Sequence, residues 1–137
     1  MKKLGLSLMA LLMLPLMATA CGVGPQTADG YEDAPITHAY QHWQQGKTSS
    51  IPFMFLDVRT PEEYAEGHIK GAILIPVQTL AEHLSEIPKN KQVYVYCHSG
   101  VRSARASTML AKHGFTNIEN VVGGIVAWKK SSYPVEK

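Results

Sequence analysis

Apolar side chains along the chain are grouped in short blocks that polar and glycine-containing stretches separate. The clearest block, Val93-Tyr94-Val95-Tyr96, is rich in the β-branched and aromatic residues that favour strands. Similar blocks stand at residues 53–56 and 72–75, and we expect the last strand at residues 118–122. Continuous apolar runs of this length are typical of strands buried on both faces of a parallel sheet. The pattern therefore predicts a parallel sheet that contains these four segments.

Segments with helical signals alternate with these blocks. We expect helices, caps included, at residues 37–46, 60–67, 79–87, 102–114 and 125–130. The clearest signal is Thr60-Pro61-Glu62-Glu63, where a capping threonine precedes a proline at the first helical position and a glutamate that completes a capping box. Strands that alternate with helices predict an α/β fold in which helices flank a central parallel sheet.

The first twenty residues have the pattern of a bacterial export signal. Met1-Lys2-Lys3 is basic, Leu4 to Met17 is apolar, and Ala18-Thr19-Ala20 supplies small residues. The apolar run is too short for a comfortable membrane span. We therefore expect residues 1–20 to be a signal peptide and the mature protein to be exported to the periplasm.

Cys21 stands directly after this signal. Ala18-Thr19-Ala20-Cys21 resembles a lipobox, although Ala18 occupies the position where leucine is usual. We favour lipidation of Cys21, which predicts a membrane-anchored lipoprotein, and ordinary signal peptidase cleavage is the alternative. Residues 21–34 are small, polar and rich in glycine, which predicts a flexible tether. Residues 35–137 would then form the single domain.

Charge narrows the range of partners. The formal net charge of +2 falls to zero once a signal peptide that contains Lys2 and Lys3 is removed, and no basic tract remains. We therefore expect no nucleic-acid binding, and membrane contact only through a lipid on Cys21. We expect the protein to be a monomer.

Cys97 is the main chemical candidate because it lies where a predicted strand gives way to a predicted helix. The connection His98-Ser99-Gly100-Val101 can curl its backbone N–H groups toward the sulfur, and the helix that follows directs the positive end of its dipole to the same point. Arg102 adds a permanent positive charge. A cysteine at a strand end can be a simple small apolar residue, but this electropositive setting is typical of reactive thiols.

The segment C-H-S-G-V-R from Cys97 to Arg102 resembles the active-site loop of rhodanese-type sulfurtransferases. Three further stretches resemble the same family in the same order: Asp57–Tyr64, Gly67–Ala72 and Gly123–Trp128. Together the motifs cover roughly residues 35–132. The resemblance implies a rhodanese-like three-layer fold and a thiosulfate sulfurtransferase-like enzyme.

The resemblance also implies roles for individual residues. Cys97 would attack the sulfane sulfur of a donor such as thiosulfate and hold it as a persulfide, which a thiophilic acceptor such as cyanide or a thiol then removes. Donor binding would involve Arg102 together with His98, Ser99, Gly100 and Val101. Asp57 and Arg59 are expected to pair and to support the loops, and His68 is expected to be structural. This scheme requires no metal and no organic cofactor.

Two other function classes stay open. Cysteine phosphatases and arsenate reductases, some of them on the same fold, place five residues between the cysteine and the arginine, whereas four separate Cys97 from Arg102. The shorter loop forms a smaller cradle, which disfavours a tetrahedral phosphate or arsenate. The second alternative is a non-catalytic sulfane-sulfur carrier or a binding module, because a sequence cannot show turnover.

Overall fold

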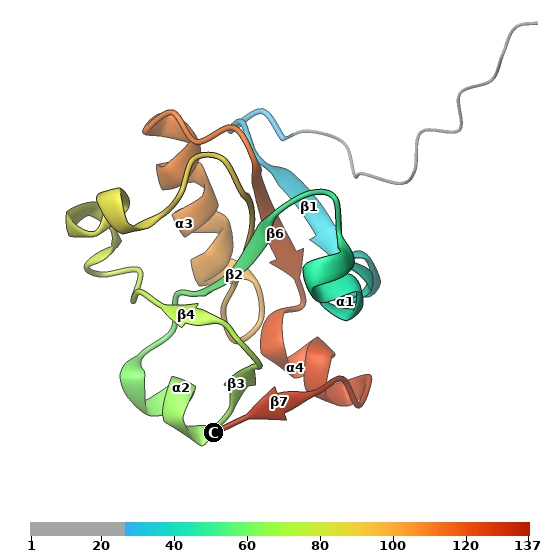
Figure 1. Cartoon of the computed structure of the whole chain (residues 1–137). Coiled ribbons are helices and arrows are strands. Elements are labelled where there is room, and N and C mark those ends of the chain that lie inside the picture. The colour runs from blue at the N-terminus through green and yellow to red at the C-terminus, as the bar shows by residue number, and fades with distance from the viewer. Residues whose placement is uncertain (1–26) are drawn as a thin grey trace, which may run out of the picture.

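The computed structural model describes residues 27–137, which form a five-stranded sheet flanked by helices (Figure 1). All neighbouring strands run parallel, in the order β1-β6-β5-β2-β4, so β5 is central. The strand bounds are β1 Glu32–Pro35, β2 Phe53–Asp57, β4 Ile73–Leu74, β5 Gln92–Tyr96 and β6 Ile118–Val122. This is the α/β architecture that the alternating pattern predicts. The predictions for the signal peptide and Cys21 concern residues outside the described range.

The connections between these strands are mostly helical. The α-helices are α1 Ile36–Gln45, α2 Pro61–Glu66, α3 Val101–Lys112 and α4 Gly124–Lys130. Short 3₁₀ segments are η1 Gly46–Thr48, η2 Leu80–Glu82 and η3 Leu84–Glu86. A second, two-stranded antiparallel sheet joins β3 His68–Ile69 to β7 Val135–Glu136, close to the end of the chain. Among residues 27–137, the helices are all too short or too polar to cross a membrane.

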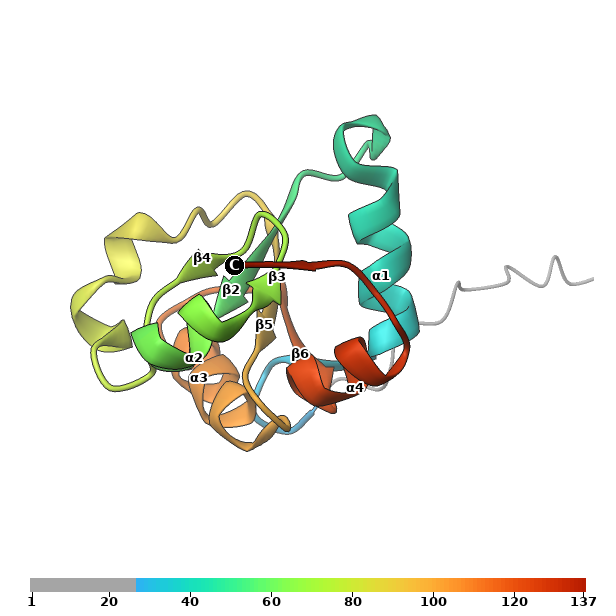
Figure 2. The same ribbon diagram turned by 90° about the horizontal axis from the view of Figure 1, so that it is seen from below.

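Each face of the sheet carries its own apolar core. One core contains Leu56 and Val95 and is covered by α3 together with the η2–η3 segment. The other contains Phe55 and Tyr94 and is covered by α1 and α4, with Trp128 fully buried. Figure 2 shows α3 on one side and α1 with α4 on the other. Successive strand residues point to opposite faces, so strands buried on both faces are apolar throughout.

The fold begins earlier in the chain than the sequence predicts. Residues 32–35 were expected to be mostly tether, but they form β1, which pairs with β6 along Glu32–Pro35, and Ala34 is buried. Helix α1 then starts at Ile36, directly after the strand, and not behind a Thr37 cap. An edge strand with the sequence Glu-Asp-Ala-Pro lacks an apolar pattern because only one of its side chains is buried.

Two other predictions are wrong in detail. The helix expected at residues 79–87 is a pair of single 3₁₀ turns, and the Thr79 hydroxyl donates backward to the Pro76 carbonyl instead of capping a helix. The strand expected at residues 72–75 is reduced to Ile73–Leu74. Because β4 is the edge strand, the Ile73 side chain is 51% exposed and not buried as expected.

Candidate active site

The carboxyl ends of the two central strands bring the sequence motifs together. Cys97 directly follows β5, and Asp57 ends β2 opposite Tyr96. The Val58 N–H extends this pairing by donating to the Tyr96 carbonyl at 3.0 Å. Parallel α/β sheets bind their ligands beyond these carboxyl ends. The candidate site therefore lies where the fold class places a ligand.

The Cys97 thiol lies at the base of the loop that follows β5 and is only 1% exposed. The Gly100 N–H donates to its Sγ at 3.1 Å, and Gly100 adopts a left-handed φ of +114° that permits this curl. Burial alone would raise the pKa of the thiol. Hydrogen bonds from the Ser103 hydroxyl and from the backbone N–H groups of Ser103, Gly100 and Ser99 outweigh burial and leave the pKa below its ordinary value. The loop therefore favours the nucleophilic thiolate.

A buried chain of hydrogen bonds leads away from the thiol. The Cys97 thiol donates to Ser103 Oγ at 3.5 Å, and Ser103 Oγ in turn lies 2.6 Å from Asn120 Oδ1, to which it can donate. Asn120 Nδ2 donates to Asp33 Oδ1 at 2.8 Å. When the thiol ionises, the Ser103 hydroxyl becomes the donor and the sulfur the acceptor. Helix α3, β6 and β1 thus fix the position of one hydroxyl beside the nucleophile.

The N-terminus of α4 holds the loop from the other side. Ile125 N–H donates to the Cys97 carbonyl at 2.9 Å, and Val126 N–H donates to the His98 carbonyl at 3.2 Å. A Cβ at Gly124 would lie 2.5 Å from both of these carbonyl oxygens. Only glycine at position 124 therefore permits this approach.

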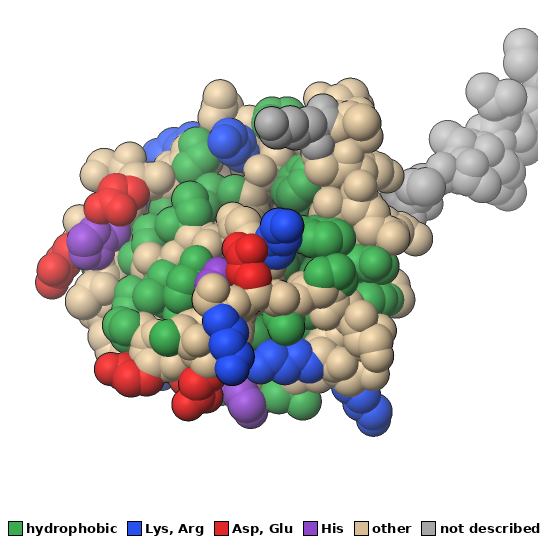
Figure 3. Space-filling view, turned by 60° about the horizontal axis from the view of Figure 1, so that its bottom comes forward, with side chains coloured by type: hydrophobic (Ala, Val, Ile, Leu, Met, Phe, Trp, Pro, Cys, Tyr) green, Lys and Arg blue, Asp and Glu red, His purple; other side chains and the backbone are tan. Residues whose placement is uncertain are grey.

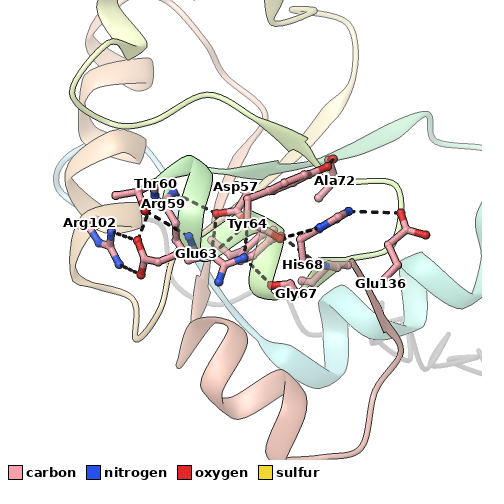
Figure 4. A network of polar contacts seen from close by, with 12 residues as sticks. Asp57, Arg59, Thr60, Glu63, Tyr64, Gly67, His68, Ala72, Arg102 and Glu136 are labelled. Atoms are coloured by element: carbon pink, nitrogen blue, oxygen red, sulfur yellow. Dashed lines mark hydrogen bonds and ion pairs between the residues drawn. The ribbon is translucent and has the colours of Figure 1, made fainter.

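Arg102 is engaged by a residue from a different motif (Figure 4). Its Nη1 and Nη2 donate to the two carboxylate oxygens of Glu63, each at 2.7 Å. Glu63 Oε2 also accepts from the Thr60 N–H at 3.0 Å, which completes the predicted capping box of α2. Mainly because Arg102 donates to it, the pKa of the Glu63 carboxyl falls to about 2. The carboxylate is therefore ionised at every physiological pH.

Asp57 and Arg59 form the expected pair, fully inside the protein (Figure 4). Arg59 donates through Nε and Nη2 to the Asp57 carboxylate, with Nη2 to Oδ2 at 2.6 Å, and also to the Gly67 carbonyl at 2.9 Å. His68 stacks on Tyr64 with ring centroids 3.6 Å apart, and its Nδ1 lies 3.0 Å from the Tyr64 carbonyl. These contacts tie the segment that follows β2 to the end of α2 and the start of β3.

The remaining loop residues contribute backbone more than side chain. His98, Ser99 and Val101 are exposed, and Val101 is 70% exposed. Within residues 27–137, no hydrogen bond joins the His98 or Ser99 side chain to Cys97 Sγ. The loop therefore presents N–H groups to the sulfur and side chains to the outside.

Sequence reasoning missed three residues that complete the site. Glu63 was identified only as part of a helix cap, although it also pairs with Arg102 across 39 positions. Ser103 follows Arg102 directly and lies in the first turn of α3, three positions after Gly100, so the sequence already indicated that it lies close to the loop. Asn120 is a polar residue in a buried strand block, which was a second signal for a buried hydrogen bond.

Comparison with known proteins agrees with this geometry. Residues 38–131 match the family model of the rhodanese-like domain, so the chain belongs to the rhodanese-like domain family. A protein named sulfurtransferase from Allochromatium vinosum is 39% identical over 82 residues, which are 60% of this chain and 77% of that protein. Thiosulfate sulfurtransferase 16 from Arabidopsis thaliana chloroplasts is 37% identical over 94 residues, with 60% of this chain and 78% of that protein covered.

A solved structure gives the same result for the fold. The crystal structure of a rhodanese-related protein from Thermoplasma volcanium superposes with a TM-score of 0.69 at 33% sequence identity. The match covers 77% of this chain and 98% of that one. The family and its sulfurtransferase-named members support sulfur transfer as the general activity.

Proposed function

We propose that this protein is a sulfurtransferase that moves sulfane sulfur from thiosulfate or a similar donor to a thiophilic acceptor through a persulfide on Cys97. The observation that carries the proposal is the Gly100 N–H donating to Cys97 Sγ at the end of β5, inside a loop that lowers the pKa of the thiol. Such a thiolate is a strong nucleophile toward sulfur.

In the first half of the cycle, the Cys97 thiolate attacks the outer sulfur of thiosulfate. A new S–S bond forms, the bond between the outer sulfur and the sulfonate sulfur breaks, and sulfite leaves with the electron pair. The terminal sulfur of the persulfide then carries the negative charge. Backbone N–H groups at the start of α3 would stabilise that charge as they do the thiolate.

In the second half, an acceptor removes the terminal sulfur. Cyanide, for example, attacks that sulfur, thiocyanate leaves, and the Cys97 thiolate returns. A cellular thiol would take the sulfur by the same displacement. Every step is a two-electron displacement at sulfur, so the cycle consumes no oxidant and no reductant.

The phosphatase alternative is weaker because of the loop itself. Four residues separate Cys97 from Arg102, the thiol is 1% exposed, and both terminal nitrogens of Arg102 bond to Glu63. A tetrahedral phosphate needs a wider cradle and a free arginine fork. A terminal sulfane sulfur is narrow enough to approach the thiol end-on.

The site of action is part of the same proposal. The basic and apolar pattern of residues 1–20 supports export, and Cys21 at the predicted cleavage point supports a lipid anchor that holds the domain at a periplasmic membrane surface. Labelling of cells with a radioactive fatty acid tests the anchor, because Cys21→Ser abolishes incorporation if Cys21 is the lipidated residue.

The activity is tested by thiocyanate formation from thiosulfate and cyanide with the soluble domain. We expect turnover by the wild type and none by Cys97→Ala. Transfer of one sulfur atom per protein molecule, without turnover, would indicate the carrier alternative. Hydrolysis of an aryl phosphate without thiocyanate formation would favour the phosphatase.

A further inference from the structure

The ion pair between Arg102 and Glu63 changes what the loop can bind. A guanidinium grips a sulfonate best with two parallel N–H groups. In this structure Nη1 and Nη2 of Arg102 already make that grip on Glu63, at 2.7 Å on both sides. An anionic donor group must either displace this carboxylate or use the N–H groups that remain.

Glu63 is poorly placed to move aside. Its Oε2 is tied to the Thr60 N–H, and the Thr60 hydroxyl accepts from the Glu63 N–H, so the carboxylate is part of the cap of α2. It also stays ionised, because the pKa of its carboxyl lies near 2. A fixed negative charge therefore cancels the charge of Arg102 beside the loop, and it repels a dianion at close range.

Exposed apolar side chains surround the loop, which suits a donor that carries an organic group. Val101 is 70% exposed, Val122 49% and Val126 45%. All three adjoin the loop, because Val101 follows it, Val126 bonds to the His98 carbonyl, and Val122 precedes the Gly123-Gly124 turn. Figure 3 shows one face of the molecule, on which apolar side chains lie among charges of both signs. The exposed apolar side chains of these valines offer little attraction to a small dianion.

We propose that Glu63 is a specificity-determining residue: by occupying the donor fork of Arg102, it biases the site against sulfonated donors such as thiosulfate and toward persulfides of organic thiols. The inference rests on the proposed function. With a persulfide R–S–SH, the Cys97 thiolate attacks the outer sulfur, the S–S bond of the donor breaks, and the thiolate R–S⁻ leaves. The products are the Cys97 persulfide and a thiolate, so atoms and charge balance without any further reagent.

The experiment compares two donors and three proteins. Initial rates of Cys97 persulfide formation are measured with thiosulfate and with the persulfide of 2-mercaptoethanol, for wild type, Glu63→Gln and Glu62→Gln. Glutamine keeps the capping geometry of Glu63 and removes its charge. Glu62→Gln removes the same charge from an exposed neighbour in the same helical turn.

We expect Glu63→Gln to raise kcat/KM for thiosulfate about tenfold, mainly through a lower KM, as the loss of one opposing charge at contact distance implies. Its kcat/KM for the persulfide should stay within about twofold, and Glu62→Gln should leave both values within about twofold of wild type. An unchanged or lower preference for thiosulfate in Glu63→Gln would overturn the proposal. Sulfur loading by a persulfide in all three proteins keeps the proposed function intact in that case, whereas no loading by either donor overturns both.

Discussion

Gly124 packs directly against the Cys97 carbonyl, and a Cβ at this position would lie 2.5 Å from that oxygen and from the His98 oxygen. Gly124 also has a φ of +54°. Gly124→Ala must therefore push α4 away from the loop. We expect a loss of about 3 kcal/mol in the free energy of unfolding, measured by urea denaturation, and slower sulfur loading of Cys97.

The matched control for this prediction is Gly71→Ala. Gly71 also has a left-handed φ, +83°, but a Cβ there would have no neighbour within 4 Å. Backbone strain alone should cost about 1 kcal/mol, without slowing sulfur loading. Equal costs for the two variants would mean that close packing of α4 on the loop contributes nothing.

Removal of the Ser103 hydroxyl should raise the pKa of the Cys97 thiol, because this side chain is a hydrogen-bond partner that lowers it. We expect Ser103→Ala to move the pH profile of alkylation by iodoacetamide to higher pH and to slow alkylation at pH 7 about fivefold, as the loss of one hydrogen bond to a thiolate implies.

Ser107 supplies the control for that experiment. It is buried on the same helix, one turn after Ser103, and its Oγ has no hydrogen-bond partner among the described residues. Ser107→Ala should leave the alkylation profile in place. A similar shift in both variants would show that general loosening of α3, and not the hydroxyl beside Sγ, controls the thiol.

The buried pair of Asp57 and Arg59 should matter for folding more than for chemistry. Asp57→Asn leaves Arg59, which is 3% exposed, without its charge partner. We expect the free energy of unfolding to fall by about 3–5 kcal/mol in thermal or urea denaturation. The partly exposed Arg102–Glu63 pair gives the contrast, since Glu63→Gln should cost less than about 1 kcal/mol. Similar losses in the two variants would mean that the buried pair contributes no more to stability than the partly exposed pair.

The buried carboxyl of Glu119, which lies outside the candidate active site, should make the free energy of unfolding depend on pH. Glu119 is buried on β6 opposite Glu32 of the neighbouring strand β1, and burial raises the pKa of its carboxyl to about 7. His38 and His42 of α1 and Tyr94 of β5 complete the cluster, with His38 Nε2 at 3.4 Å from Glu119 Oε2.

The sign follows from proton binding. Between the ordinary pKa near 4.5 and the folded pKa near 7, the folded protein keeps a proton that the unfolded chain releases, so stability falls as pH rises. Glu119→Gln removes this dependence. We expect the stability of the variant relative to wild type to grow by about 3 kcal/mol from pH 4.5 to pH 8. A constant difference in urea denaturation across that range would contradict the assignment.

Long apolar blocks made most of the fold predictable. Residues 53–56, 93–96 and 118–122 are strands within a residue of the expected bounds. For residues 53–56 and 93–96, full burial on both faces leaves an unbroken apolar run, whereas β6 also carries the buried polar residues Glu119 and Asn120. Edge elements were not predictable in the same way. β1 buries one side chain, and β3 pairs with β7 over only two residues. Neither strand therefore produces a hydrophobic pattern long enough to be detected in the sequence.

The predictability of the site residues also depended on how far apart they lie in the sequence. Local chemistry identified Cys97, the curled loop and the Asp57–Arg59 pair, since each lies within a few residues of sequence. The Arg102–Glu63 pair and the Ser103–Asn120–Asp33 chain join segments 17 to 87 positions apart. Contacts of that kind depend on strand order, which only the three-dimensional structure provides.

The central claim is that Cys97 carries the transferred sulfur, and intact mass spectrometry tests it most directly. The soluble domain, starting after Cys21, is weighed before and after treatment with a sulfane-sulfur donor and again after cyanide, beside Cys97→Ala. We expect the wild type alone to gain one sulfur atom, about 32 Da, and to lose it to cyanide. An unchanged mass with both thiosulfate and a persulfide, while Cys97 still reacts with iodoacetamide, would contradict the assignment of this protein as a sulfurtransferase.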